Sequence, residues 1–145
     1  MRKSCISVII LLILNSCSRT PKPDTSILES YRQYQIVSGI KIRLKKEKLS
    51  EVSRDTLISL AEQIAPKDAE IKLIKAANFQ SKGKLSLAQN ALEEAIKISP
   101  GYSPAFSSYG EFLIANGYQK LGRDYCRHAV ALNPINIVAR NCAQQ

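Results

Sequence analysis

The fold is decided by two consecutive stretches of 34 residues, AEIKLIKAANFQSKGKLSLAQNALEEAIKISPGY at 69–102 and SPAFSSYGEFLIANGYQKLGRDYCRHAVALNPIN at 103–136. Aligned with each other, they carry small, aliphatic, glycine and proline residues at the same places. A fixed period of this length is the signature of a protein whose repeated units stack on one another. The matched pairs are Ala76 and Gly110, Phe79 and Leu113, Gly83 and Gly117, Ala88 and Gly122, Leu92 and Cys126, Ala95 and Ala129, Ile98 and Leu132, and Pro100 and Pro134.

Each matched place has a mechanical reason in a pair of antiparallel helices. Small residues allow the two helices of a unit to cross closely. Gly83 and Gly117 can adopt the positive φ that turns the first helix into the second. Pro100 and Pro134 end the second helix, because a proline disfavours helical backbone in the residue before it. The pattern therefore predicts one helical hairpin in each stretch.

Polar side chains are expected to cap several of these helices. Ser103 precedes a proline, which is favoured in the first turn of a helix. Ser86 and Gln89 have the spacing of a capping box. Asn136 is expected to cap a short final helix at 137–145, which would cover the open face of the last repeat.

The matched places are those that define the tetratricopeptide repeat, and residues 69–134 resemble that family. The resemblance implies an all-α fold, an α-solenoid of antiparallel helix pairs with clear repeats at 69–102 and 103–136. It also implies a concave groove, lined by the first helix of each repeat, that holds another protein or a peptide. The implied groove residues are Leu73, Ala77, Gln80, Ser107, Glu111 and Ile114.

Leu73 and Ile114 are expected to be the apolar anchors of this groove, since a few desolvated side chains dominate most interfaces. Some relatives clamp a C-terminal carboxylate with an arrangement of Lys and Asn that is not evident in this sequence. The resemblance therefore favours a partner that docks by shape and by apolar contacts.

The helices before the clear repeats depart from the family pattern. Residues 26–66 are interpreted as a degenerate first repeat, with helices expected over about 26–46 and from residue 50 or 51 to about 64. Lys72 and Lys75 stand where the family usually has bulky apolar residues. We therefore expect the repeat at 69–102 to pack less conventionally on what precedes it.

The first 16 residues are typical of an export signal, with two basic residues before a nine-residue apolar run at 6–14. Nine helical residues span about 14 Å, well short of the ~30 Å hydrocarbon core of a bilayer. The tetrad Leu14-Asn15-Ser16-Cys17 resembles a bacterial lipobox, which makes Cys17 the expected lipid attachment site. A tether at 17–25 follows. Simple secretion, with Cys17 as an incidental thiol, is the alternative.

Export and lipidation predict a place in the bacterial cell envelope, and Ser18 is permissive for the periplasmic face of the outer membrane. Cys126 and Cys142 are the thiols left beyond Cys17. Because export delivers them to an oxidising compartment, we expect a disulfide between the last repeat and the capping helix. Two buried thiols are the alternative.

The formal net charge of +9 owes much to a basic cluster around residues 41–48. We interpret this cluster as a solvated helix face, with attraction to anionic headgroups as the alternative. No recognition module accompanies it, so no nucleic-acid partner is expected. The basic residues of the cluster are Lys41, Arg43, Lys45, Lys46 and Lys48.

Signatures of catalysis are missing from the sequence. The single histidine, His128, accompanies no nucleophile motif, and with Cys126 and Cys142 it offers at most three zinc ligands on different turns. Glu93 and Glu94 are adjacent on a helix and point in different directions. We therefore expect a binding protein and not an enzyme, with no catalytic residue, metal, cofactor or small-molecule substrate.

The stretch Ser108-Tyr109-Gly110-Glu111-Phe112-Leu113 is similar to a string in type IV pilus biogenesis lipoproteins, which also combine a lipobox with these repeats. The predicted function is a membrane-anchored, periplasm-facing adaptor or assembly factor of the cell envelope, with pilus or secretin biogenesis as one setting. A regulator of an envelope or peptidoglycan enzyme is the alternative, and a purely structural envelope protein is a third class.

Overall fold

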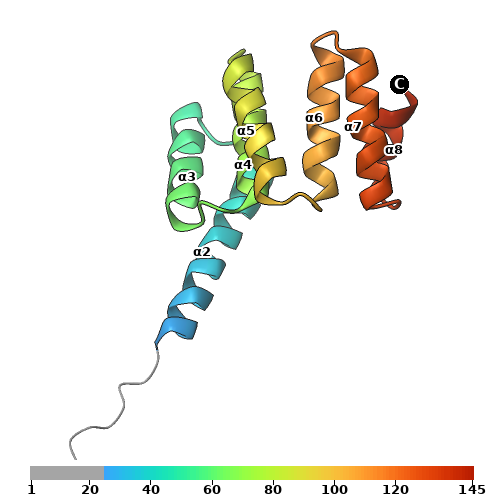
Figure 1. The fold of residues 1–145 in the computed structure, drawn as a ribbon. Coiled ribbons are helices and arrows are strands. Elements are labelled where there is room, and N and C mark those ends of the chain that lie inside the picture. Colours follow the sequence, from blue (N-terminus) through green and yellow to red (C-terminus); the bar gives the residue numbers. More distant parts are fainter. Residues whose placement is uncertain (1–24) are drawn as a thin grey trace, which may run out of the picture. The chain divides into compact units, whose positions relative to one another are not determined.

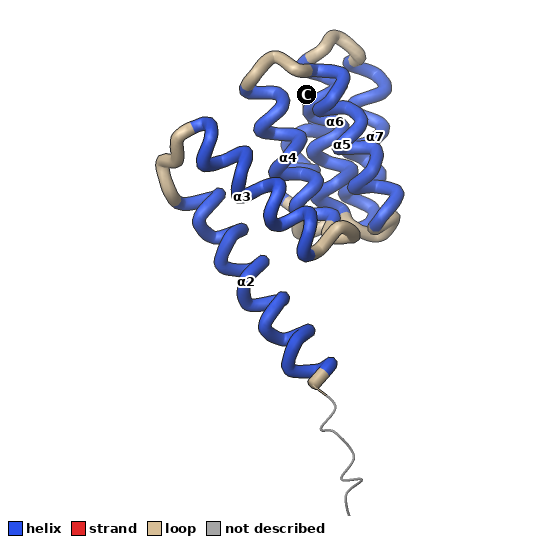
Figure 2. Tube along the Cα trace, turned by 90° about the vertical axis from the view of Figure 1, so that its left-hand side faces the viewer, coloured by secondary structure: helices blue, strands red, loops and turns tan. Residues whose placement is uncertain are grey.

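The computed structural model describes residues 25–145, and Figure 1 shows that they form helices joined by short loops. No strand occurs among these residues (Figure 2). The all-α prediction is confirmed. The signal at 1–16, Cys17 and the tether up to residue 24 lie outside the described residues. The helices are α2 (Ser26–Lys46), α3 (Glu51–Ile64), α4 (Ala69–Ser81), α5 (Leu85–Ile98), α6 (Ser103–Ala115), α7 (Gln119–Leu132) and α8 (Ile137–Gln144).

The chain divides into two units, Met1–Arg32 and Gln33–Gln145. The first unit is described only from residue 25 onward, where the opening turns of α2 carry exposed Ile27, Leu28 and Tyr31. The second unit contains the rest of α2 and all of α3 to α8. All that follows concerns this second unit.

The two clear repeats are helical hairpins that share a core. Ala88 and Leu92 of α5 pack with Tyr109 and Phe112 of α6, and all four side chains are buried. Tyr109 also donates a hydrogen bond to the Glu93 carboxylate at 2.8 Å. Burial, followed by this bond, raises the pKa of Tyr109 to about 12. The phenol therefore stays protonated and joins the second helix of one repeat to the first helix of the next.

Helices α6 and α7 cross at a pair of glycines. A Cβ atom at Gly110 would lie 2.7 Å from the carbonyl oxygen of Gly122, and one at Gly122 would lie 2.6 Å from that of Gly110. Because neither backbone can move away from the other without separating the helices, only glycine fits at both places. The small residues predicted for this crossing have the expected role.

The turn and stop signals in the sequence are also confirmed. Gly83 and Gly117 have φ values of 69° and 89°, in the left-handed region that glycine favours. Helices α5 and α7 end two residues before Pro100 and Pro134.

The cap predictions have mixed outcomes. Asn136 caps α8, since its side chain accepts a hydrogen bond from the Ala139 amide at 3.1 Å. The prediction for Ser103 is wrong, because its hydroxyl donates to the Ala129 carbonyl at 2.8 Å instead. The capping box at Ser86 is also wrong, since α5 begins one residue earlier and has no side-chain cap.

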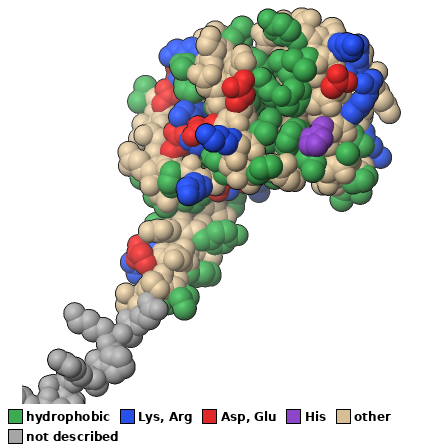
Figure 3. Space-filling view, in the orientation of Figure 1, with side chains coloured by type: hydrophobic (Ala, Val, Ile, Leu, Met, Phe, Trp, Pro, Cys, Tyr) green, Lys and Arg blue, Asp and Glu red, His purple; other side chains and the backbone are tan. Residues whose placement is uncertain are grey.

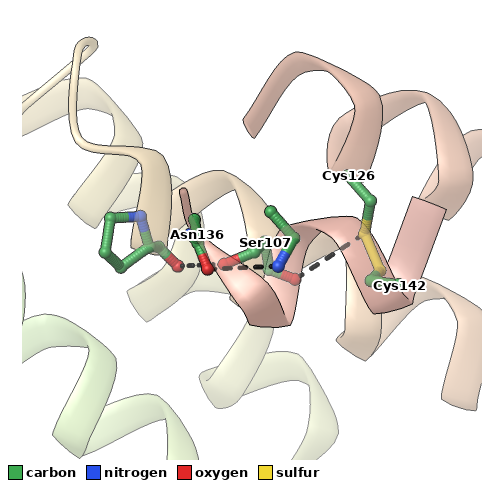
Figure 4. The surroundings of a disulfide bond; sticks show 6 residues. Ser107, Cys126, Asn136 and Cys142 are labelled. Atoms are coloured by element: carbon green, nitrogen blue, oxygen red, sulfur yellow. Dashed lines mark hydrogen bonds between the residues drawn. A yellow bond between two sulfur atoms is a disulfide. The ribbon is translucent and has the colours of Figure 1, made fainter. Parts of the chain in front are cut away.

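Helix α8 is fastened to the last repeat by a disulfide between Cys126 and Cys142, shown in Figure 4. Both side chains are fully buried, and their Cα atoms are 5.7 Å apart. This separation lies in the usual range for a disulfide. Asn136 adds a second link, because its amide donates to the Ser103 hydroxyl at 2.8 Å.

The N-terminal side of the second unit combines a small apolar cluster with ion pairs. Val37, Ile40 and Leu44 of α2 pack with Ile58 of α3 and Ile71 of α4. Around this cluster, lysines and carboxylates from different helices lie side by side, and the face drawn in Figure 3 shows acidic and basic side chains next to each other. The expectation of less conventional packing is confirmed.

Lys72 and Lys75 account for that departure. The Nζ atom of Lys72 lies 2.7 Å from the Glu62 carboxylate of α3 and 3.0 Å from that of Glu94 on α5. Lys75 also reaches Glu62, at 2.8 Å. A lysine whose side chain is only 8% exposed is tolerated here because both neighbours are negative.

Candidate functional site

A groove of about 570 Å³ lies between α4 and α6. This volume is in the range of ~300–1,000 Å³ that is usual for ligand-binding clefts. Its walls come from the first helices of the two clear repeats, and α5 contributes to the floor. The lining residues are Leu73, Ala76, Ala77, Gln80, Leu85, Leu92, Ser108, Glu111, Phe112, Ala115 and Asn116.

The helical spacing explains which residues reach this groove. Leu73, Ala76, Ala77 and Gln80 follow the i, i+3, i+4, i+7 pattern of one helix face, and so do Ser108, Glu111, Phe112 and Ala115 on α6. The structure thus places four of the six predicted groove residues in the lining, namely Leu73, Ala77, Gln80 and Glu111.

Ile114 does not line the groove, and its assignment as an anchor is corrected. A Cβ atom at Gly122 would lie 2.6 Å from Cγ1 of Ile114, so this side chain packs against the glycine of α7. Leu73 does line the groove but also packs against the core, where it contacts the clusters around Leu92 and Ala95.

Ser107 is the second correction. Its side chain is 2% exposed, its hydroxyl donates to the Pro104 carbonyl at 3.2 Å, and its own carbonyl lies 4.0 Å from Sγ of Cys126. Ser107 therefore lies against α7, with its carbonyl toward the disulfide, as Figure 4 shows.

Sequence reasoning missed Ser108, Phe112, Leu85 and Asn116. The sequence contained a signal for two of them, because Ser108 and Phe112 share a helix face with Glu111, which was predicted to line the groove. The amide of Asn116 is already used, since it donates to the Phe112 carbonyl at 2.7 Å.

Glu111 differs from the partly buried carboxylates Glu62 and Glu70, because its side chain is exposed at the groove. Within residues 25–145, no hydrogen bond or ion pair to its carboxylate is found. Burial alone raises its pKa, because the surrounding chain removes water and supplies no cation in return.

Glu62 and Glu70 show the contrasting case. Lys72 and Lys75 flank Glu62, and Lys41 and Lys45 flank Glu70. Burial opposes ionisation of Glu62, but the hydrogen bonds to its two lysines outweigh it and lower the pKa of this carboxyl. The hydrogen bond from Lys45 is the largest influence on Glu70 and lowers its pKa.

The basic cluster at 41–48 is exposed except at Lys41, and three of its five basic residues form ion pairs. Lys41 contacts Asp68 at 2.5 Å, Lys45 contacts Glu70, and Arg43 contacts Glu47 at 3.1 Å. The remaining two basic side chains, Lys46 and Lys48, are exposed.

The other residues considered for chemistry are dispersed. His128 is exposed, and its ring lies 4.5 Å from that of Phe106. Glu93 and Glu94 have different partners, Tyr109 and Lys72. In the described part of the chain, no group of three or more potential ligands could hold a metal ion. No helix among residues 25–145 is both long and apolar enough to cross a membrane.

Comparison with known proteins identifies structures with a similar fold. No protein-family model and no curated protein matches the sequence. Several solved structures match the fold. Part of a mutant O-GlcNAc transferase from Thermobaculum terrenum superposes on 77% of this chain with a TM-score of 0.68 and 20% identity. The chain spans only 22% of that transferase.

Two isolated repeat domains agree with this match. The TPR domain of Arabidopsis OM64 covers 79% of this chain and is itself covered to 93%, with a TM-score of 0.63 and 17% identity. The first TPR domain of Spaghetti (RPAP3), bound to the HSP90 peptide SRMEEVD, covers 79% of this chain and is covered to 90%, with a TM-score of 0.64 and 16% identity. At such identities the likeness shows the fold alone. The described chain is therefore an all-α solenoid of the tetratricopeptide-repeat type.

Proposed function

We propose that this protein is a lipid-anchored adaptor or assembly factor of the bacterial cell envelope, which holds a segment of another protein in the groove between α4 and α6. The observation that supports this most is the groove itself, which has an apolar floor and a rim of Gln80, Ser108 and Glu111. An apolar cleft with a few polar groups is what a specific binding site requires.

The structural neighbours add support from their partners. The first TPR domain of RPAP3 is bound to the HSP90 peptide SRMEEVD, and the second TPR domain of human RPAP3 is in complex with the HSP70 peptide SGPTIEEVD. Both partners are short peptides, so a groove of this fold is wide enough for one.

The groove is tested by blocking it without disturbing the core. Ala77 and Ala115 are exposed and line the groove, so a larger side chain at both positions fills the groove without replacing a core residue. We expect Ala77→Trp/Ala115→Trp to abolish capture of the natural partner, while the helical circular-dichroism signal and Tm stay near wild type.

The matched control reverses charges outside the groove. Lys46→Glu/Lys48→Glu is chosen because Lys45 supports the fold through Glu70. This control should alter capture only modestly, and mainly at low salt. Capture that survives the groove variant and disappears in the lysine variant would overturn the groove assignment and favour an electrostatic platform.

The proposed anchor is a lipid on Cys17, which lies outside the described residues. Its support is the basic start, the short apolar run and the lipobox-like tetrad at 14–17. Labelling of growing cells with an alkyne fatty acid should modify the intact protein and fail with Cys17→Ala. Equal labelling of both proteins would contradict the anchor.

An outer-membrane location facing the periplasm belongs to the same proposal, since it follows from export, lipidation and Ser18. A setting in pilus or secretin assembly has weaker support. The string at 108–113 that resembles pilus lipoproteins contains Tyr109, Gly110, Phe112 and Leu113, which are all buried. Packing within the repeat therefore explains why this string resembles the one in pilus lipoproteins.

A further inference from the structure

The carboxylate of Glu111 gives the groove a negative charge. Of the described residues that line it, Glu111 is the only one with a charged side chain. It stands on α6 opposite an apolar wall that includes Leu73 and Ala77 of α4. Any segment that enters this groove therefore meets one negative group among apolar surfaces.

The fold elsewhere shows how such a carboxylate is normally accommodated. Glu62 and Glu70 each have two lysine ammonium groups within contact distance. Glu111 has none within residues 25–145, although its surroundings remove enough water to raise its pKa. A groove carboxylate that has lost part of its water, and has no cation beside it, is stabilised when a partner supplies that cation.

We propose that the groove between α4 and α6 selects a partner segment in which a lysine or arginine lies between apolar residues, with the cation held by the Glu111 carboxylate. The apolar neighbours pack on Leu73, Ala77 and Ala115, while Gln80 and Ser108 offer hydrogen bonds to the segment's backbone. A segment that places a carboxylate at this point is repelled by the like charge. This inference rests on the proposed function, because it names the chemistry of the partner in the same groove.

The test uses the full chain purified in detergent and a library of octapeptides that are acetylated and amidated, with Arg, Lys, Gln or Glu at one central position and mixed apolar residues around it. Wild type should enrich the Arg and Lys peptides at least about threefold over the Gln peptides, as expected for one exposed or half-exposed ion pair. Peptides with Glu should be depleted.

Three variants make the test specific. Glu111→Gln keeps the shape of the side chain and should lose the preference, and Glu111→Lys should reverse it toward Glu peptides. Asp124→Asn removes a carboxylate that is exposed on α7 and pairs with Arg127, so it should leave the preference unchanged. Circular dichroism of each variant checks that it is folded.

A fourth variant separates this inference from the proposed function. Ala77→Trp fills the groove at an exposed position. Peptide binding that is lost in Ala77→Trp but shows no charge preference in wild type would overturn the role of Glu111 and leave the groove as the binding site. A basic preference that persists in Glu111→Gln would overturn it as well. Binding that persists in Ala77→Trp, or no binding of any peptide, would count against the groove and the inference together.

Discussion

At the C-terminal end of the second unit, α6, α7 and α8 are joined by a glycine contact and a disulfide, whereas at its N-terminal end ion pairs surround the apolar cluster that joins α2, α3 and α4. Gly110 and Gly122 make the first kind of contact. Glu62 with Lys72 and Lys75 makes the second. The two ends of the same repeat architecture therefore differ in what supplements their apolar packing, namely close helix contact and a disulfide at one end and ion pairs at the other.

One period of the sequence explains the difference. The places occupied by Gly110 and Gly122 in the last repeat are occupied by Ile42 and Arg54 in the degenerate one. The degenerate repeat therefore lacks the small pair at these places, and Ile42 is 51% exposed. Arg54 instead donates to the Leu44 carbonyl at 3.1 Å, which satisfies a backbone group near the end of α2. Loss of a small pair is thus compensated by polar contacts.

The largest effect is expected at the glycine contact. In Gly122→Leu, the new side chain would meet the Gly110 carbonyl and Ile114, so the helices must separate. We expect the free energy of unfolding to fall by about 3 kcal/mol or more, measured by urea unfolding. The control Gly101→Ala, where a Cβ atom meets no described atom within 4 Å, should stay within about 0.5 kcal/mol of wild type. Equal loss in both variants would contradict the close crossing.

The disulfide is expected to come next. Its two cysteines are 16 residues apart, and a loop of this length predicts a contribution of about 3 kcal/mol. A reducing agent should lower the Tm of the wild-type protein and leave that of Cys126→Ala/Cys142→Ala unchanged. A wild-type Tm that does not respond to reduction would show that the thiols are not joined in solution.

A smaller loss is expected when the ion pairs are broken. Glu62→Gln removes one of the two negative partners of Lys72, whose side chain is mostly buried, and should cost about 1–3 kcal/mol at neutral pH. The pKa of Glu62 is lowered in the folded protein, so the folded chain binds this proton more weakly than the unfolded chain. The stabilisation is therefore present above the usual value of 4.5 and is lost as the pH falls through the lowered pKa.

The measurement that follows is urea unfolding of wild type and Glu62→Gln at pH 7 and at about pH 3. The gap between the two proteins should shrink at the lower pH, because the unfolded wild-type chain gains stability by binding a proton at Glu62 that the folded chain binds more weakly. A gap that is independent of pH would attribute the loss to packing and not to charge.

The smallest effect is expected at Arg43. Its ion pair with Glu47 is about half exposed on both sides. Such pairs contribute little in water, so Arg43→Ala should change the free energy of unfolding by about 0.5 kcal/mol or less. A loss as large as that of Glu62→Gln would mean that exposure does not decide which ion pairs hold this end.

The sequence predicted those features that depend on local backbone chemistry. Gly83 and Gly117 were predicted as turn residues because a positive φ favours glycine. Asn136 was predicted as a cap because its side-chain oxygen can accept from a free N–H group at the start of α8. Ser103 has the same local pattern but donates to Ala129 of another helix. Tertiary contacts therefore overrode the cap, and no local pattern contains them.

The groove assignments failed for a geometric reason. The period makes Ser107 and Ile114 equivalent to Leu73 and Gln80, but the first helix of a repeat has two edges. On α4 the edge with Leu73 and Gln80 faces the next repeat. The equivalent edge of α6 faces α7 and α8, where Ser107 and Ile114 are used for packing. Equivalence in sequence does not fix which neighbour a residue faces at the end of a solenoid.

The most direct test of the groove as the functional surface is site-specific photo-crosslinking in cells that make the full-length protein. A photoreactive phenylalanine derivative is placed at Ala77 or Ala115 in the groove, and at Lys120, which is exposed on α7, as the control. We expect both groove positions to crosslink the same partner and Lys120 to crosslink none. A partner that crosslinks from Lys120 and from neither groove position would contradict the account.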